Sequence, residues 1–199
     1  LVSFLHKGYR NINWLNSLKQ SKNKLKIYFP LHLQPELSTS NFGGIYYDQI
    51  YALKKLCDAL DKSDIPNIIY VKENPKQSQI NRIFLNLFKD KSNIEFISRD
   101  VSSSDLINNC DFVYTISGTA GWEAIKSGKK CLLLGHCWYE TAPGVYRNLK
   151  ELLVDRNNEV NNSAVLNWYN NHKKFLHFMQ NDTTIDEMDS NIKKTSQEL

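Results

Sequence analysis

The sequence predicts an α/β fold, a Rossmann-like open parallel sheet with helices on both faces. Short apolar segments of strand character alternate with helical segments along most of the 199 residues. This order is typical of parallel strands joined by right-handed helical crossovers, which cover both faces of a sheet. The polar motifs follow predicted strands, and ligands bind at the carboxyl ends of strands in such folds.

Each predicted strand is a short apolar run that ends at a turn signal. The first two runs stop at Pro30 and at Asn74-Pro75. The predicted strands cover residues 26–31, 67–72, 94–97, 111–116 and 130–134.

The predicted helices carry apolar residues at helical spacing. They cover residues 9–20, 45–60, 78–89, 102–109, 120–127, 147–154 and 161–179. We expect residues 1–24 to be a helical segment or linker, residues 25–180 to be the Rossmann-like domain, and residues 181–199 to be a loose tail.

Composition excludes several classes of protein. The net charge of +4 suits a small anionic ligand or an anionic membrane surface, but is too weak and dispersed to indicate nucleic acid. No apolar run approaches the roughly 20 residues of a membrane span, and we expect no signal peptide. The four cysteines form no C-x-x-C pair, which favours reduced thiols in a cytosolic protein. A zinc site at Cys131, His136 and Cys137 is the alternative; we expect no metal.

The stretch TISGTAGWEAI, residues 115–125, joins a strand to a helix through a turn of small residues. The turn offers backbone N–H groups, the hydroxyls of Ser117 and Thr119 and the positive end of a helix dipole, which together suit a phosphate. Gly118 allows a ligand to approach the backbone closely. Glu123, one turn into the helix, is placed for a ribose hydroxyl. The alternative is a plain strand–turn–helix connection without a ligand.

The loop after the first predicted strand concentrates acid–base groups. It reads PLHLQPELST over residues 30–39 and contains His32, Gln34, Glu36 and Ser38. Glu36 has the chemistry of a general base, an acid or a nucleophile. The alternative is a loop whose polar groups satisfy its own backbone and cap the next helix.

The second predicted strand ends in VKENP, residues 71–75. Lys72 at the end of a buried strand requires an anion, supplied either by a ligand or by Glu73. Asn74 and Pro75 either contact that ligand or only form the turn.

The segment LGHCWYETAPGV, residues 134–145, places His136, Trp138 and Tyr139 together after a strand. Such a loop favours a sugar or base bound through stacking and hydrogen bonds. The alternative is an aromatic cluster that covers the edge of the sheet.

These motifs resemble the capsular-polysaccharide biosynthesis proteins, a group that includes the bacterial β-Kdo transferases. The resemblance lies in YFPLHLQPELSTSNFGG, YVKENP, TISGTAGWEAIKSGKKCLLLGHCWY and PGV, and covers residues 25–150 in order. The QPE loop together with GHxWY is more specific to this group than the turn. The resemblance implies the C-terminal, donor-binding half of a GT-B glycosyltransferase, with an N-terminal Rossmann half as its partner.

The same resemblance implies a metal-independent transferase that needs no cofactor. Its substrates would be a nucleotide-sugar donor, such as CMP-Kdo or a related CMP-sugar, and a glycan or glycolipid acceptor. We expect it in the cytoplasm, peripheral to the inner membrane. Related enzymes carry histidine where this chain has Asn74, which cannot supply charge or a proton. The implied site consists of catalytic Glu36 and His32; donor-binding Lys72, Asn74, Pro75, Ser117, Gly118, Thr119, Glu123 and His136; and acceptor- or sugar-binding Gln34, Ser38, Trp138 and Tyr139.

Two other interpretations stay open. A nucleotide-sugar 2-epimerase with the GT-B fold would use the same turn and add acid–base groups near C2 of the sugar. A non-catalytic module would bind nucleotide or a capsule-assembly partner without turnover.

Overall fold

The computed structural model describes residues 14–33, 41–77 and 82–180. The chain divides into two compact units, Leu1–Val165 and Leu166–Leu199. The sheet belongs to the first unit. Gln34, Glu36 and Ser38 of the predicted site lie outside the described residues, as do the expected tail and the first 13 residues.

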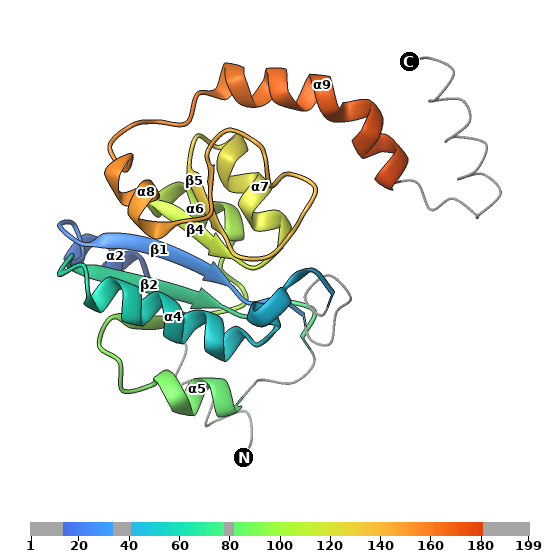
Figure 1. Cartoon of the computed structure of the whole chain (residues 1–199). Coiled ribbons are helices and arrows are strands. Elements are labelled where there is room, and N and C mark those ends of the chain that lie inside the picture. Colours follow the sequence, from blue (N-terminus) through green and yellow to red (C-terminus); the bar gives the residue numbers. More distant parts are fainter. Residues whose placement is uncertain (1–13, 34–40, 78–81, 181–199) are drawn as a thin grey trace. The chain divides into compact units, whose positions relative to one another are not determined.

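The first unit is built on a six-stranded parallel sheet of order β3-β2-β1-β4-β5-β6. From β1 the chain moves outward to β3, then returns to the other side of β1 and moves outward again (Figure 1). The carboxyl ends of β1 and β4 therefore form the switch point at which such sheets bind ligands. The predicted fold class is confirmed. The strands are β1 (Leu25–Pro30), β2 (Asn67–Lys72), β3 (Ile94–Ile97), β4 (Phe112–Thr115), β5 (Lys130–Leu133) and β6 (Val145–Tyr146).

The helices follow the predicted order, with one division. The expected helix 45–60 is a short 3-10 helix followed by an α-helix, because the Asp48 carboxylate accepts the Ile50 N–H at 2.8 Å and caps a new start. The helical elements are α2 (Trp14–Gln20), η1 (Gly44–Tyr47), α4 (Gln49–Asp61), α5 (Arg82–Phe88), α6 (Ser103–Asn109), α7 (Thr119–Lys126), α8 (Leu149–Val154) and α9 (Asn162–Gln180).

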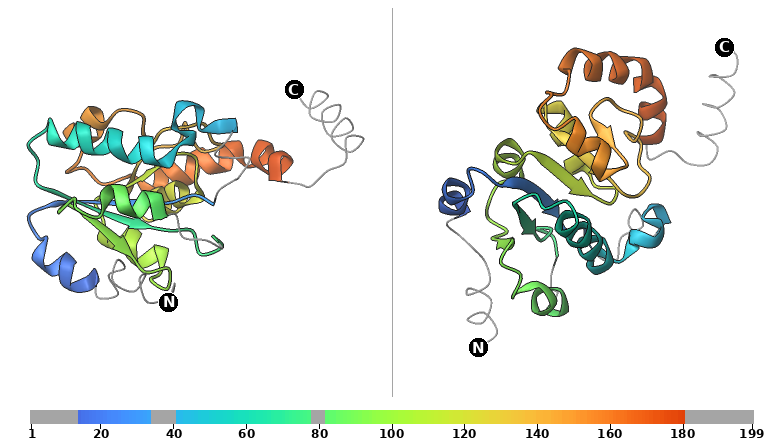
Figure 2. Two further views of the ribbon diagram at one scale, coloured as in Figure 1. Left: turned by 90° about the horizontal axis from the view of Figure 1, so that it is seen from below. Right: turned by 60° about the vertical axis from the view of Figure 1, so that its left-hand side comes forward.

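Helices cover both faces of the sheet because successive strand residues point to opposite sides. Ile27 and Phe29 pack in one core with residues of α4, α5 and α8. Tyr28, between them in sequence, packs in the other core with residues of α2, α6 and α7. Figure 1 shows α4 in front of β1 and β2, and the left view of Figure 2 shows α2 and α4 on opposite sides of the strands.

Residues 14–20, expected in a helical segment or linker, form helix α2 and pack against the sheet. The Trp14 side chain is 5% exposed and meets the Tyr70 ring edge-on at 6.3 Å. The Ser17 hydroxyl donates to Glu95 of β3 at 2.5 Å. Burial of Trp14 and the bond from Ser17 tie α2 to the sheet, and α2 lies within the predicted helix 9–20.

Helix α9 spans the boundary between the two units. The sheet-bearing unit ends at Val165, whereas the sequence predicted a domain up to residue 180. After Val165, helix α9 leaves Leu166 60% and Tyr169 39% exposed. Its regular helical spacing predicted this helix correctly. Within the described ranges, every helix is too short or too polar to pass through a bilayer.

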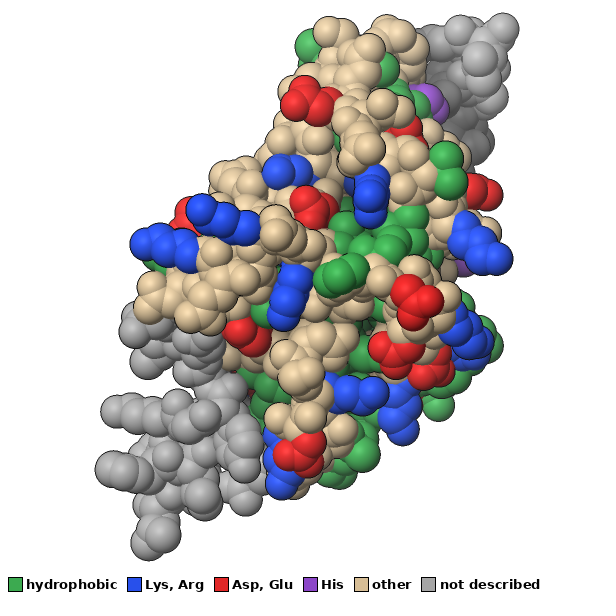
Figure 3. All heavy atoms as spheres, turned by 90° about the vertical axis from the view of Figure 1, so that its left-hand side faces the viewer, with side chains coloured by type: hydrophobic (Ala, Val, Ile, Leu, Met, Phe, Trp, Pro, Cys, Tyr) green, Lys and Arg blue, Asp and Glu red, His purple; other side chains and the backbone are tan. Residues whose placement is uncertain are grey.

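The face at the amino ends of β1 and β2 carries charges of both signs. Figure 3 views the molecule from this side and shows basic and acidic side chains interspersed. A hollow of about 510 Å³ there is lined by Lys22, Lys24, Lys26 and Arg156 together with Asp64 and Asp111. Alternating charges do not form the continuous basic surface that nucleic acid requires.

Candidate functional site

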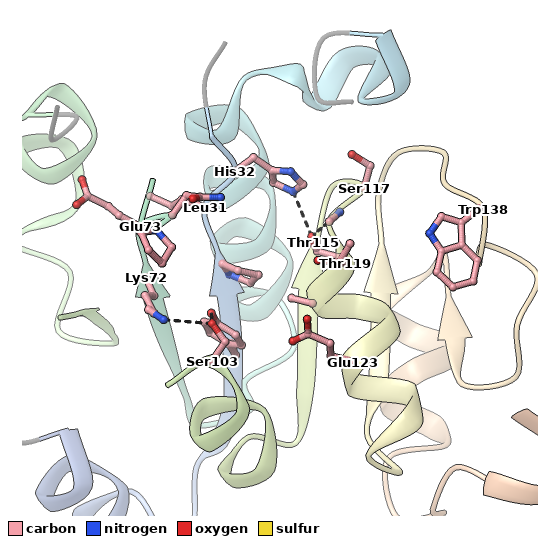
Figure 4. Close-up of a pocket in the computed structure, with 16 residues that line it drawn as sticks. Leu31, His32, Lys72, Glu73, Ser103, Thr115, Ser117, Thr119, Glu123 and Trp138 are labelled. Atoms are coloured by element: carbon pink, nitrogen blue, oxygen red, sulfur yellow. Dashed lines mark hydrogen bonds between the residues drawn. The ribbon is translucent and has the colours of Figure 1, made fainter. Parts of the chain in front are cut away.

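A cavity of about 410 Å³ lies at the carboxyl ends of β1, β2 and β4, at the switch point of the sheet. Its walls also include the starts of α6 and α7 and one side chain from the loop after β5. In Figure 4, Lys72 lies on one side of it, Thr119 and Glu123 on the other, and Trp138 beyond them. The cavity brings together nine of the predicted site residues: His32, Lys72, Asn74, Pro75, Ser117, Gly118, Thr119, Glu123 and Trp138.

The turn between β4 and α7 forms one wall. Gly118 is the residue before the first turn of α7, and its own N–H donates to the Thr115 hydroxyl at 3.2 Å. The next two N–H groups, those of Thr119 and Ala120, have no carbonyl partner within the helix because they begin it. These two N–H groups, rather than that of Gly118, are the donors that the turn offers to an anion.

Gly118 is required by packing rather than by backbone conformation. Its φ of −76° is accessible to any residue. A Cβ at this position would lie 3.0 Å from Cε1 of His32 and 3.0 Å from the Thr115 hydroxyl oxygen. A side chain at residue 118 would therefore push the imidazole away from the turn.

His32 is fixed at the end of β1 from two directions. Its Nε2 lies 3.2 Å from the Thr115 hydroxyl, and its backbone N–H donates to Oε1 of Gln49 at 2.6 Å. The Gln49 side-chain amide in turn donates a hydrogen bond to the His32 carbonyl at 3.3 Å. Burial lowers the pKa of His32 from 6.5 to about 4. The imidazole is therefore neutral at pH 7 and does not serve as a cation.

Lys72 lies on the opposite wall of the cavity and supplies a basic group there. The residue is 4% exposed, and its ammonium donates to the Ser103 hydroxyl at 3.1 Å. The same hydroxyl lies 3.2 Å from that of Tyr28. Burial lowers the pKa of Lys72, while the carboxylates of Asp100 and Glu123 oppose the shift.

Glu73 does not supply the internal anion considered for Lys72. Its carboxylate forms an ion pair with Arg99 instead, and accepts from Nε at 3.1 Å and lies 3.0 Å from Nη2. Within the part of the chain that the structure describes, no carboxylate forms an ion pair with Lys72. A buried ammonium without such a partner is unfavourable unless a ligand brings the charge.

Asn74 and Pro75 form a turn at the rim of the cavity. The Asn74 side-chain oxygen accepts the Lys76 N–H at 2.9 Å, and its carbonyl accepts the Gln77 N–H at 3.0 Å. The Asn74 oxygen is thus engaged within the turn, although both residues line the cavity. Glu123 also lines the cavity and is exposed.

The loop after β5 differs from expectation at two residues. Tyr139 is 0% exposed and donates its hydroxyl to the Gly118 carbonyl, so it is not placed to touch a sugar. The His136 side chain is 74% exposed, bonds Glu140 at 2.9 Å and lies outside the cavity lining, away from a donor bound there. Trp138 does line the cavity and packs against Trp122 with ring centroids 4.7 Å apart.

The cysteines are free thiols, three of them buried: Cys57, Cys110 and Cys131. Cys137 is half-buried, and burial raises its pKa to about 11. Considering only the described residues, no group of three or more His, Cys, Asp or Glu side chains is arranged to hold a metal ion. Cys131 lies under α7, beside Gly121.

Three hydroxyl-bearing residues of the cavity wall were not among the predicted site residues: Tyr28, Ser103 and Thr115. Ser103 belongs to a run of three serines that indicated only a helix start. Thr115 was assigned to a strand, although a hydroxyl on the last residue of a buried strand is a signal for a site at the carboxyl edge. Tyr28 carried no signal, since a tyrosine in a strand is ordinarily core.

Several solved structures are similar to this chain, and the first of them supports the fold. Staphylococcus aureus MnaA in its UDP co-structure is 18% identical, with a TM-score of 0.51 over 85% of this chain and 50% of that chain. The β-Kdo 2,7 transferase KpsC of Thermosulfurimonas dismutans is 19% identical, with a TM-score of 0.47 over 63% of this chain and 40% of that one. The UDP-GlcNAc 2-epimerase of Methanocaldococcus jannaschii is 15% identical, with a TM-score of 0.49 over 78% and 48%. The chain thus spans half or less of the length of these proteins.

The fold places this chain among the Rossmann-like α/β proteins. Residues 13–174 match the family described as capsule polysaccharide biosynthesis protein, and the chain belongs to that family. No curated protein matches the sequence significantly.

Proposed function

We propose that this chain is the donor-binding half of a metal-independent GT-B glycosyltransferase in bacterial capsular or surface polysaccharide synthesis. Its donor is a nucleotide-activated sugar, a CMP-sugar such as CMP-Kdo. The observation that carries the proposal is the cavity at the switch point, where the buried Lys72 ammonium faces the start of α7. Membership of the capsule family supports the biological setting.

The two walls suit the chemistry of a phosphate leaving group. In the transfer, the bond between the anomeric carbon and the phosphate oxygen breaks, and its electrons remain on the nucleotide. The Lys72 ammonium, the hydroxyls of Ser117 and Thr119 and the first N–H groups of α7 stabilise that charge. Glu123 holds a ribose hydroxyl, and Asn74 and Pro75 border the nucleotide.

The remaining groups act on the sugar and the acceptor. Glu36 takes the proton of the attacking acceptor hydroxyl as a general base. His32, held neutral beside the turn, orients a hydroxyl or phosphate oxygen by hydrogen bonding. Trp138 offers its ring to the sugar, and Gln34 and Ser38 contact the acceptor from the Glu36 loop.

The full activity requires a second Rossmann half that closes over this edge of the sheet. The acceptor is a glycan or glycolipid, and the enzyme works on the cytoplasmic face of the inner membrane.

The double variant Ser117→Ala/Thr119→Ala tests the donor role. Loss of both hydroxyls should weaken CMP binding at least tenfold, which corresponds to about 1.4 kcal/mol. Thr141→Ala is the control, because Thr141 is exposed and lies outside the cavity lining. Unchanged CMP affinity in the double variant would remove the phosphate from this turn.

A further inference from the structure

Tyr139 is a polar side chain that the proposed mechanism leaves without a role. It is completely buried, and its hydroxyl donates to the Gly118 carbonyl at the head of α7. The same carbonyl accepts the Gly121 N–H at 3.1 Å. A carbonyl oxygen has two lone pairs, so both acceptor positions of Gly118 are occupied.

These two hydrogen bonds to the Gly118 carbonyl determine the direction of the Thr119 N–H. In a planar trans peptide, the C=O of one residue and the N–H of the next point in opposite directions. Because the Gly118 carbonyl is turned toward Tyr139 and into α7, the Thr119 N–H points out of the helix start. On that side lies the cavity, which Gly118, Thr119 and Ala120 line.

The surroundings of Tyr139 keep its hydroxyl in this position. A Cβ on Gly121 would collide with that hydroxyl and would lie 2.7 Å from Sγ of Cys131. The absence of a side chain at Gly121 therefore makes room for the phenol. The Trp138 ring packs edge-on against Tyr139 at 5.2 Å, and the Trp122 ring lies at 6.3 Å.

The protonation state of the phenol is also constrained. Burial raises the pKa of Tyr139 far above its ordinary value. The hydroxyl keeps its proton throughout the neutral range, so it acts as a donor to the carbonyl and never as a charged group.

We propose that Tyr139 is a positioning residue of the anion site: its hydroxyl fixes the Gly118–Thr119 peptide so that the Thr119 N–H faces the phosphate of the ligand. Tyr139 acts through the backbone and does not touch the ligand. The inference rests on the proposed function in that it takes this turn as the place where phosphate binds.

Tyr139→Phe tests the inference, because it removes the hydroxyl and keeps the ring. The matched control is Tyr114→Phe. Tyr114 is 2% exposed and donates its hydroxyl to a backbone carbonyl, that of Ala52, at 2.9 Å, but it does not line the cavity. Both variants lose one buried hydroxyl–carbonyl bond, so their denaturation midpoints should fall by similar amounts.

Affinity is measured by calorimetry on the full chain, with CMP and with inorganic pyrophosphate. We expect Tyr139→Phe to bind both probes at least fivefold more weakly, and Tyr114→Phe to stay within twofold of the parent. The carbonyl ¹³C chemical shift of Gly118, measured by NMR on the protein without ligand, reports the hydrogen bond to that carbonyl directly. It should move upfield in Tyr139→Phe and remain in place in Tyr114→Phe, since one hydrogen bond to that oxygen is lost only in the first.

A second variant approaches the same contact from the other side. Gly121→Ala places a methyl group against the Tyr139 hydroxyl and should weaken pyrophosphate binding as well, which keeps the test decisive if Tyr139→Phe does not fold. Parent-like affinity in a folded Tyr139→Phe, or an equal loss in Tyr114→Phe, would overturn the inference.

The parent chain separates this inference from the proposed function. Binding of pyrophosphate without CMP would end the nucleotide proposal, while the pyrophosphate comparison would still decide the role of Tyr139. Binding of neither probe at millimolar concentration would overturn both.

Discussion

Thr115→Val should destabilise the domain by about 2 kcal/mol. The side chain is fully buried, and its hydroxyl joins the Gly118 N–H at 3.2 Å to Nε2 of His32 at 3.2 Å. Valine keeps the shape but makes neither bond. Each lost bond costs about 1 kcal/mol, and the part-buried Gly118 N–H, left without an acceptor, adds about 1 kcal/mol. The extra methyl group recovers part of this, on the order of 0.8 kcal/mol.

Calorimetry and guanidinium unfolding measure the effect. For a protein of this size, 2 kcal/mol corresponds to a fall in Tm of about 4–8 °C. Thr141→Val makes the same change at an exposed position and should stay within about 0.5 kcal/mol of the parent. If Thr115→Val were as stable as Thr141→Val, the hydroxyl would not be the link between the imidazole and the turn.

Two further outcomes are expected. Between pH 7 and pH 5, the free energy of unfolding should fall by about 2 kcal/mol more in the parent than in His32→Gln. The unfolded imidazole takes up a proton near its ordinary pKa of 6.5, whereas burial lowers the pKa of the folded protein's His32 to about 4. Equal pH slopes in guanidinium titrations would contradict this. Lys72→Met should reduce CMP affinity at least tenfold without loss of stability, since it removes a buried charge that has no ion-pair partner in the described chain; calorimetry showing unchanged affinity would remove the ammonium from the site.

The strands could be predicted to within about two residues because each is a short apolar run bounded by a turn signal. The strand β6 was missed, since two residues within a loop carry no periodic pattern. The break before α4 was also missed, although Asp48 is a capping residue type. Its flanking apolar residues continued the helical spacing and concealed the cap.

The candidate site was predictable where it lies on strand ends and not where it depends on long-range contacts. The sequence placed Lys72 and the turn of α7 at one edge of the sheet, and the cavity contains both. The sequence did not show that Glu73 binds Arg99, because the two residues lie 26 positions apart. The aromatic loop also predicted that Tyr139 contacts the ligand. Only the packing under Gly121 distinguishes a buried phenol from a sugar-stacking ring.

The proposed function depends on binding of a cytidine nucleotide in the switch-point cavity. Calorimetric titration of the chain with CMP, CDP, UMP and UDP measures this binding. We expect saturable binding of CMP in preference to the other three nucleotides, abolished when Lys72→Met and Ser117→Ala/Thr119→Ala are combined. Binding of UDP in preference would instead indicate a UDP-sugar transferase or epimerase. The absence of binding at millimolar CMP would remove the nucleotide from this cavity.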